Sequence, residues 1–522
     1  MSTNFTTPGV YINELNAFPN SVVPVATAIP AFIGYTPRAS YNGKSYTGLP
    51  VPISSWQEFL LYFAALDPAT AQPLSTHQQS TPVFYPAATT APTPDLVIAG
   101  HAYDVRPDAG TLFYLWHSVQ LFYQNGGGTC YVVSVGPYGP LRQNAGSSKS
   151  APLANPNVRL ADLSGALTAL QQVPAVTLIV IPDATLLPAA DYATLAQQTL
   201  AHCGNMQTCV ALLDVIGGAA PNPQTWFNDT ITPFRTAVGL QSLCYGAAYY
   251  PFLQTTVLAA TDLDYRNVGG GAAALSALLP SAATAPLKTL LAQIGSTAPG
   301  APTPAQLDTA LRAASPAYAQ LQAVMLAQAN ILPPSGAVAG VYTLVDNQNG
   351  VWKAPANVAL SAVTGTTLAI NDTMQAPLNV DAATGKSINA IRVFPALGPV
   401  IWGARTLDGN SDDWRYVNVR RTVIMLEQSM KLAAQPLMFE PNTANTWSLI
   451  TSMLNNFLTS QWSQGALAGA TPAAAFSVAC GLGTTMTADD ILNGIINVSV
   501  KVAISHPAEF IVINFQQVQQ TS

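Results

Sequence analysis

The stretch NVRRTVIMLEQSM, residues 418–430, opens the region whose pattern decides the fold of this chain. Its apolar side chains recur at helical spacing, and Glu427 and Lys431 have the four-residue offset that stabilises a helix by about 0.3 kcal/mol. A second helix is predicted after PNT (441–443), with a core-facing side from Trp447 to Trp462 and with Gly465 as its stop. The region therefore begins as a layer of packed helices.

Two strands are predicted to follow these helices. Thr487 and Asp490 form a capping box that starts a short third helix, which Gly494 ends. Residues 496–504 then alternate strictly, as a strand with one buried face does. After His506-Pro507, another strand is expected over residues 509–517. This region has no nucleophile beside a base, no metal-ligand spacing and no phosphate loop.

Several blocks of this region, in this order, resemble the C-terminal domain of tail sheath proteins from contractile phage tails and phage-tail-like injection systems. They are Arg420-Arg421, Glu440-Pro441-Asn442, Trp447, Gly465-Ala466-Leu467, Ala475-Phe476 and Pro507-Ala508-Glu509-Phe510. The most specific match is PPSG (333–336) followed by GVWKAPAN (350–357). PGVYINE (8–14) and TAIPAFIG (27–34) resemble the N-terminal signature of the same family. The resemblance fails over residues 67–95 and 255–330, which are interpreted as insertions.

The composition predicts a chain whose surface is partly covered by other proteins. Only 8% of the 522 residues are charged, against about 25% in ordinary soluble domains. A surface with so few charges is expected to be covered by copies of the chain or by a partner. The net charge of −6 argues against nucleic-acid binding, and no apolar run is long enough to span a bilayer. The first 18 residues lack the pattern of a signal peptide, so synthesis and assembly in the bacterial cytoplasm are expected.

Residues 160–250 alternate between helical segments and continuous apolar strands, which predicts a parallel sheet covered on both faces. Asp183 and Asp214 follow two of these strands, at the end where α/β enzymes place ligands. This is the main argument for an enzyme. The structural alternative is that each aspartate caps the helix or turn that follows it. Cys203 and Cys209, next to His202, are interpreted as reduced buried thiols, because further zinc ligands are missing nearby.

The resemblance implies a mixed α/β, multidomain sheath fold. One inner domain would be built from both chain ends, residues 1–40 and 335–522, and residues 41–334 would form an outward α/β middle domain. The implied function is a non-enzymatic subunit that polymerises into a helical contractile sheath of stacked hexameric rings around an inner tube. Baseplate and terminator proteins are the other implied partners, without nucleic acid or membrane insertion. The particle would be a phage tail or an extracellular or anchored injection particle. The alternatives are an α/β hydrolase or transferase using Asp183 or Asp214, and a static shell or tube protein.

The predicted site is an assembly surface, and no catalytic residue, cofactor or metal is predicted. The residues predicted to form arm strands between subunits are Gly9, Val10, Tyr11, Ile12, Glu14, Phe510, Ile511, Val512, Ile513 and Phe515. Such strands would pair with strands of neighbouring subunits through main-chain hydrogen bonds. The candidate inter-subunit or tube-facing charges are Arg420, Arg421, Glu427, Lys431, Asp489 and Asp490.

Overall fold

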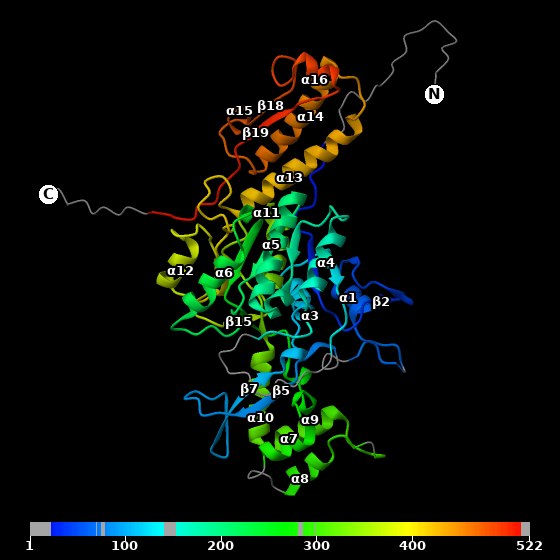
Figure 1. The fold of residues 1–522 in the computed structure, drawn as a ribbon, viewed down its shortest axis with the longest axis vertical. Helices are drawn as coiled ribbons and strands as arrows, with labels where there is room; N and C mark the ends of the chain where they lie inside the picture. The colour runs from blue at the N-terminus through cyan, green and yellow to red at the C-terminus, as the bar shows by residue number, and fades with distance from the viewer. Residues whose placement is uncertain are drawn as a thin grey trace, which may run out of the picture. The chain divides into compact units, whose positions relative to one another are not determined.

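The computed structural model describes residues 22–68, 70–74, 79–139, 153–279, 285–296 and 298–512. The chain divides into two compact units, each described here by itself (Figure 1). The large unit consists of Ala26–Ile424 and His506–Ser522, and the small unit of Met1–Val25 and Met425–Ser505.

A nine-stranded sheet forms the centre of the large unit. Its six inner strands, in the order β16-β11-β10-β9-β1-β8, run parallel to one another, and antiparallel strands add to both edges. In spatial order the strands are β14 (Val358–Ala359), β17 (Gly398–Trp402), β16 (Asn389–Phe394), β11 (Gly246–Tyr250), β10 (Val210–Asp214), β9 (Leu178–Val180), β1 (Pro30–Gly34), β8 (Cys130–Ser134) and β4 (Pro50–Ile53). Because residues 30–34, 130–250 and 389–402 share one sheet, the compact units do not divide at residues 40 and 335.

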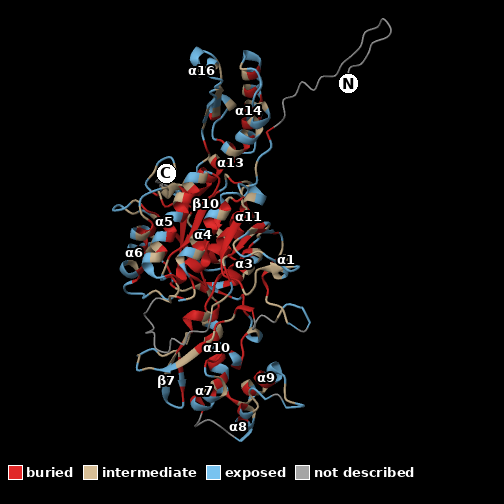
Figure 2. Cartoon of the chain, turned by 45° about the vertical axis from the view of Figure 1, so that its right-hand side comes forward, coloured by how far each residue is buried: buried red, intermediate tan, exposed pale blue. Residues whose placement is uncertain are grey.

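Helices cover both faces of this sheet. Every residue of β1, β9, β10 and β11 is buried, and successive side chains of a strand point to opposite faces, so both faces are covered. One helix layer pairs α3 (Leu115–Gln124) with α11 (Ser335–Asn349), and a second pairs α4 (Leu160–Leu170) with α5 (Ala189–Met206). Figure 2 shows the buried residues concentrated on the strands and on the helix sides that face them. The predicted parallel sheet is confirmed.

Two glycines let α3 and α11 approach closely. A Cβ at Gly336 would lie 2.5 Å from the carbonyl oxygen of Ser118, and a Cβ at Gly340 would lie 2.5 Å from that of Phe122. Both oxygens are backbone atoms, so they cannot avoid the clash by a change of rotamer as a side chain can. The side of α11 that carries Gly336 and Gly340 is therefore a contact surface against α3.

The two predicted insertions pack together into an accessory module with a hydrophobic core of its own. Residues of this core range from Phe84 to Ala329 and are distinct from the core around the sheet. The backbone N–H of Gly269 donates to the carbonyl of Phe84 over 2.8 Å, which joins the two segments. The elements are β5 (Phe84–Ala88), β6 (Leu96–Ile98), β7 (His101–Pro107), α7 (Gly271–Leu278), α8 (Ala285–Ala292), α9 (Pro304–Ala314) and α10 (Pro316–Ala329).

Short elements complete the large unit. They are β2 (Ser40–Tyr41), β3 (Lys44–Ser45), α1 (Trp56–Phe63), α6 (Thr232–Ala237), β12 (Leu253–Thr255), β13 (Ile331–Leu332), β15 (Val363–Thr366) and α12 (Asp372–Asn379). Helix α13 (Val417–Ala434) runs across the division between the units.

The small unit consists of helices and one β-hairpin-like sheet. Helix α14 (Ala444–Ser463) buries Ile450, Leu454 and Phe457, as its spacing predicted, and Gly465 follows with a φ of 92°. Helix α16 (Ala488–Leu492) has the predicted capping box between Thr487 and Asp490. The remaining elements are α15 (Pro472–Ala475), β18 (Phe476–Ala479) and β19 (Ser499–Val502). Strand β19 is shorter than the predicted 496–504 strand.

Candidate assembly site

A buried ion pair anchors the chain just after its N-terminal segment. The Arg421 guanidinium donates to both carboxylate oxygens of Asp346, at 3.0 and 2.5 Å, and both side chains are under 5% exposed. Thr27 joins the pair twice: its hydroxyl donates to Asp346 over 2.5 Å, and its carbonyl accepts from Arg421 over 3.0 Å. The guanidinium also lies over the Tyr342 ring, 4.6 Å from its centre. We call these residues the N-terminal anchor; they fix residue 27 before β1 begins.

A second ion pair anchors the chain near its C-terminal end. Glu509 accepts from Arg405 over 2.6 Å, from Asn379 over 2.7 Å and from the Tyr416 hydroxyl over 2.9 Å. Burial raises the pKa of Glu509, but these three donors outweigh it and hold that pKa below its usual value. The Arg405 side chain is 5% exposed and that of Glu509 is 20% exposed. We call these residues the C-terminal anchor.

The chain leaves the large unit directly after this anchor. Phe510, Ile511 and Val512 are 72%, 80% and 82% exposed, and none of the three belongs to a strand. The strand expected from residue 509 is therefore wrong for residues 509–512 in a single chain. A strand needs a hydrogen-bonding neighbour, and among the described residues no strand pairs with this segment. The other predicted arm residues, Gly9, Val10, Tyr11, Ile12, Glu14, Ile513 and Phe515, lie outside the described residues.

An open sheet edge lies in the small unit. Strands β18 and β19 pair antiparallel, from Phe476 opposite Val502 to Ala479 opposite Ser499. Within the described residues no third strand joins this sheet, so β18 presents backbone donors and acceptors on its outer side. Such an edge is a template for a strand of another chain, and two strands alone are marginally stable.

Comparison with known proteins gives these features a context. Residues 410–518 match the family model described as the phage tail sheath C-terminal domain. A search of curated proteins finds no match. The contracted helical sheath of the anti-feeding prophage is 26% identical over 98% of this chain and 100% of that chain, with a TM-score of 0.57. The contracted sheath complex of the extracellular contractile injection system PVC is 25% identical over 99% of both chains, with a TM-score of 0.56. Residues 410–518 therefore match the tail sheath C-terminal domain, and nearly the whole chain is similar to proteins of contractile sheaths.

A third sheath match comes from the baseplate of the anti-feeding prophage, at 25% identity over 99% of this chain and 100% of that chain, with a TM-score of 0.57. These matches support a structural role and give no support to the enzyme alternative. No helix within the described part of this chain combines the length and the apolarity needed to cross a bilayer.

The two aspartates of the enzyme alternative cap helices inside the large unit. Asp183 is fully buried and accepts from the backbone N–H groups of Tyr35 (2.9 Å), Tyr114 (2.6 Å) and Leu115 (3.2 Å), so it caps α3. Burial raises its pKa to about 6. Asp214 accepts from both the N–H and the hydroxyl of Ser335, at 2.8 and 2.5 Å, and caps α11. Burial raises its pKa to about 7.

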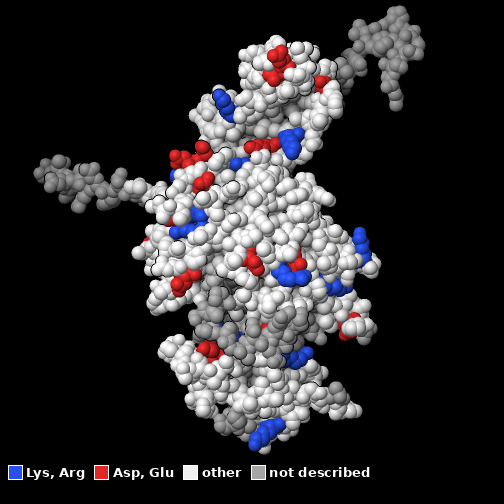
Figure 3. Space-filling view, viewed as in Figure 1, with Lys and Arg blue, Asp and Glu red and all other residues white. Residues whose placement is uncertain are grey.

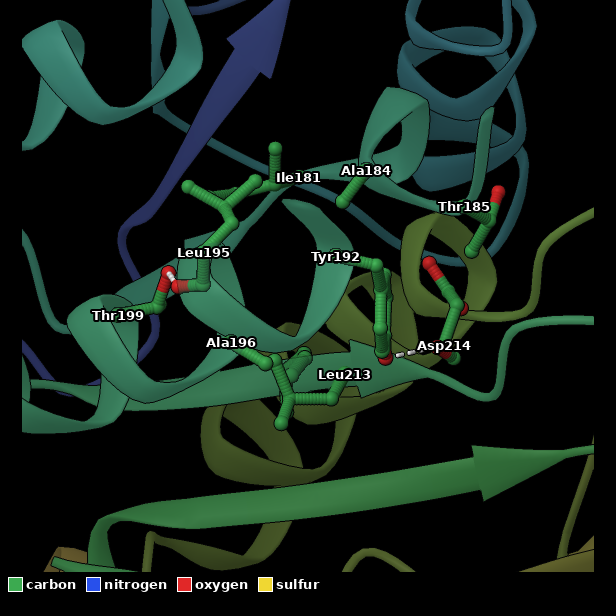
Figure 4. A pocket seen from close by; sticks show the side chains of 10 residues that line it. Ile181, Ala184, Thr185, Tyr192, Leu195, Ala196, Thr199, Leu213 and Asp214 are labelled. Atoms are coloured by element: carbon green, nitrogen blue, oxygen red, sulfur yellow. Dashed lines mark hydrogen bonds between the residues drawn. The ribbon is translucent and has the colours of Figure 1, made fainter. Parts of the chain in front are cut away.

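The cavity beside Asp214 cannot hold a substrate. It lies between α5 and β10, and Figure 4 shows the Tyr192 hydroxyl donating to the Asp214 backbone carbonyl across it. Its volume is about 10 Å³, room for no more than one water molecule. Both aspartates are capping residues, as the structural alternative held, but the expectation that each caps the helix or turn that follows it is wrong. Asp183 caps α3, which precedes it in the sequence, and Asp214 caps α11, which begins 121 residues later.

The candidate charges fall into two groups. Arg420 and Arg421 are buried, the former with its guanidinium between the Tyr245 and Trp414 rings at 4.4 and 4.3 Å. Neither can present its charge to a partner, because each is enclosed by its own chain, so the prediction of inter-subunit or tube-facing charges is wrong for both. Glu427, Lys431 and Asp489 are exposed, and Asp490 is half-buried by its capping hydrogen bonds with Thr487. Figure 3 shows acidic side chains gathered over α16.

Sequence reasoning missed the partners that make both anchors. Arg421 and Glu509 stood inside recognised blocks, but Asp346, Asn379 and Tyr416 gave no local signal. Such pairs join residues 75 to 130 positions apart. A buried cation needs a nearby anion, so the arginines of the recognised blocks were the only sequence signal from which a buried ion pair could have been predicted.

Proposed function

We propose that this protein is the sheath subunit of a contractile injection particle. Copies would form stacked hexameric rings in a helical array around an inner tube. Shortening of the array would drive the tube through a target envelope. Sequence identity of 25–26% over nearly the full chain to proteins of contracted sheaths supports this role.

The exposed segment after the C-terminal anchor is the observation that carries the proposal. Three consecutive large apolar residues, Phe510 to Val512, are exposed to solvent directly after Glu509, whose carboxylate accepts five hydrogen bonds in the C-terminal anchor. Exposure of these apolar side chains to water is unfavourable in an isolated chain. Contact with a neighbouring subunit would remove them from water and stabilise the segment. We propose that residues 510–515 add a strand to β18 of a neighbour, and that residues 9–14 form the second arm.

The anchors let these arms carry force. In the proposed mechanism the extended array is metastable, and on triggering the subunits rotate as rigid bodies into a shorter lattice that buries more surface. Arms held at residues 27 and 509 by buried charge pairs would stay attached to their own subunit while the lattice moves. The change needs no nucleotide hydrolysis.

A second exposed surface of the small unit is proposed to face a neighbouring subunit or the tube. Phe439 is 100% exposed and adopts a φ of 70°, and Leu492 is 84% exposed. Asn442 donates to the carbonyl of Ile495 over 3.1 Å, which brings the turn of Phe439 beside the segment after α16. Asp489 adds an exposed acidic group there.

We propose further that residues 1–40 and 335–522 face inward and the accessory module outward. Assembly would take place in the bacterial cytoplasm, and baseplate and terminator proteins would end the array.

Electron microscopy of a truncated chain tests the proposal. The full chain, expressed alone or with its tube protein, should form long striated tubes. The variant that ends at Glu509 keeps the C-terminal anchor, so it should fold with unchanged thermal stability and form no tubes. Tubes from the truncated chain would refute the arm role. Dispersed subunits from the full chain even with the tube protein would refute the sheath role.

A further inference from the structure

Two cysteines meet where α5 ends and β10 begins. Cys203 lies in the last turn of α5 and Cys209 directly precedes β10, and both are buried. Gln207 adopts a left-handed φ of 55° and its N–H donates to the carbonyl of Cys203 over 2.9 Å, which turns the chain back on itself. The result is a distance of 3.5 Å between the two sulfur atoms.

The surroundings activate one sulfur of this pair. The contact with the Cys203 thiol lowers the pKa of Cys209 to about 6; burial opposes the shift, and His202 and Thr208 support it. Burial raises the pKa of Cys203 well above its usual value. The pair therefore combines a thiolate, which is the reactive form of cysteine, with a neighbouring thiol that can resolve an oxidised sulfur.

We propose that Cys203 and Cys209 form an oxidation site, at which a peroxide converts the two thiols into a disulfide that ties the end of α5 to β10. The Cys209 thiolate attacks one peroxide oxygen and breaks the O–O bond, which gives a sulfenic acid and a hydroxide that is protonated to water. The Cys203 sulfur then loses its proton and attacks the Cys209 sulfur, and the displaced hydroxide leaves as a second water. Two thiols are oxidised and one peroxide is reduced. The sulfur atoms must approach by about 1.5 Å, to the disulfide length of about 2.05 Å.

This reactivity should be confined to the pair. Burial raises the pKa of Cys130 to about 12, and it also raises the pKa of Cys244 and of Cys480. A peroxide is small enough to reach a helix end during local opening. A subunit would keep its thiols in a reducing cytoplasm and close the disulfide once its particle meets an oxidising environment. This change of environment rests on the proposed function, whereas the oxidation of the cysteine pair itself does not.

Peptide mass analysis tests it directly, because residues 160–235 form one tryptic peptide whose only cysteines are Cys203 and Cys209. Folded protein is treated with hydrogen peroxide, blocked with an alkylating reagent and digested without reductant. We expect this peptide to lose two hydrogen masses and carry no alkyl group, and to gain two alkyl groups after reduction. Cys203→Ser should carry no such disulfide, and Cys480→Ser should behave as the wild type.

Three results would overturn the proposal. They are two alkyl groups on the peptide after peroxide, oxygen added to the sulfur atoms without a disulfide, and a disulfide that forms only after the protein is unfolded. If Cys203→Ser does not fold, the reduced and oxidised wild-type peptides decide the question by themselves.

Discussion

The two anchors hold opposite ends of the chain with the same chemistry, but they depend differently on the segments that they hold. In the N-terminal anchor, α11 supplies Asp346 and α13 supplies Arg421, and the terminal segment adds only Thr27. In the C-terminal anchor the terminal segment itself supplies the carboxylate, Glu509. Removal of the N-terminal segment leaves a satisfied ion pair, whereas removal of Glu509 leaves Arg405 buried without its anion. The first anchor is thus part of the core, and the second is completed by the arm.

The largest effect is expected from breaking the N-terminal anchor itself. Asp346→Asn removes the anion from a guanidinium that is 3% exposed, and loss of one partner of a buried pair costs about 3–5 kcal/mol of unfolding free energy. Urea unfolding followed by circular dichroism measures it. The control is Asp372→Asn, since Asp372 pairs with Arg392 but is 94% exposed and should change little. Equal effects of the two variants would mean that the anchor is not part of the core.

Breaking the C-terminal anchor should cost less stability but should also abolish assembly. Glu509→Ala removes charge-assisted hydrogen bonds from Arg405, and such bonds contribute about 1.5–3 kcal/mol. Thermal unfolding and tube formation are measured on the same variant. Asp412→Ala is the matched control, because Asp412 also pairs with an arginine but is 98% exposed. Normal tubes from Glu509→Ala would show that the arm does not need its anchor.

The helix that carries Asp346 offers a test of how rigidly the N-terminal anchor is held. Gly340→Ala would force a Cβ against the carbonyl of Phe122 and should destabilise the protein by about 1–3 kcal/mol. Gly165→Ala, in the exposed side of α4, meets no atom within 4 Å and should be neutral or stabilising by up to about 1 kcal/mol. The unfolding midpoints of the two variants should therefore move in opposite directions, and a parallel shift would contradict the close α3–α11 contact.

The terminal segment contributes only Thr27 to the N-terminal anchor, so a change at Thr27 should destabilise the protein less than a change at Asp346. Thr27→Val removes only the hydroxyl that donates to Asp346 and should cost about 1 kcal/mol. Thr27→Ser keeps the hydroxyl and should stay near the wild type in the same denaturation experiment. A loss as large as that of Asp346→Asn would make the two anchors alike.

The pH dependence of the C-terminal anchor gives the smallest expected effect. The pKa of Glu509 is lower in the folded protein than its unfolded value of about 4.3, so the anchor stabilises the fold fully above that value. This stability is lost as the pH falls through the folded pKa. The difference in unfolding midpoint between wild type and Glu509→Gln should be constant from neutral pH to about pH 5 and should shrink below about pH 4. A difference that grows on acidification would contradict the sign of the shift.

The sheet and most helices could be predicted from the sequence because their signals are local. Fully apolar strands such as Leu178–Val180 and capping residues such as Thr487 can be recognised from a few neighbouring positions. The short C-terminal blocks likewise sufficed for the family resemblance.

The anchors and the free C-terminal segment could not be predicted, because their structure depends on distant partners. Arg421 was noticed in its block but assigned to the surface, since nothing near it in sequence reveals that Asp346 and Tyr342 enclose it. The apolar residues after Glu509 have strand character, yet strand formation depends on an edge that the isolated subunit does not offer them. Likewise, no periodicity shows that residues 84–107 pack on residues 258–329.

A cryo-electron microscopy map of the assembled sheath tests the central claim most directly. In this map Glu509 should still pair with Arg405 of its own chain, while residues 510–515 form a strand on the outer edge of β18 in a neighbouring subunit. The claim would be contradicted by a map in which these residues remain unpaired or fold back onto their own chain, or in which Glu509 has left Arg405.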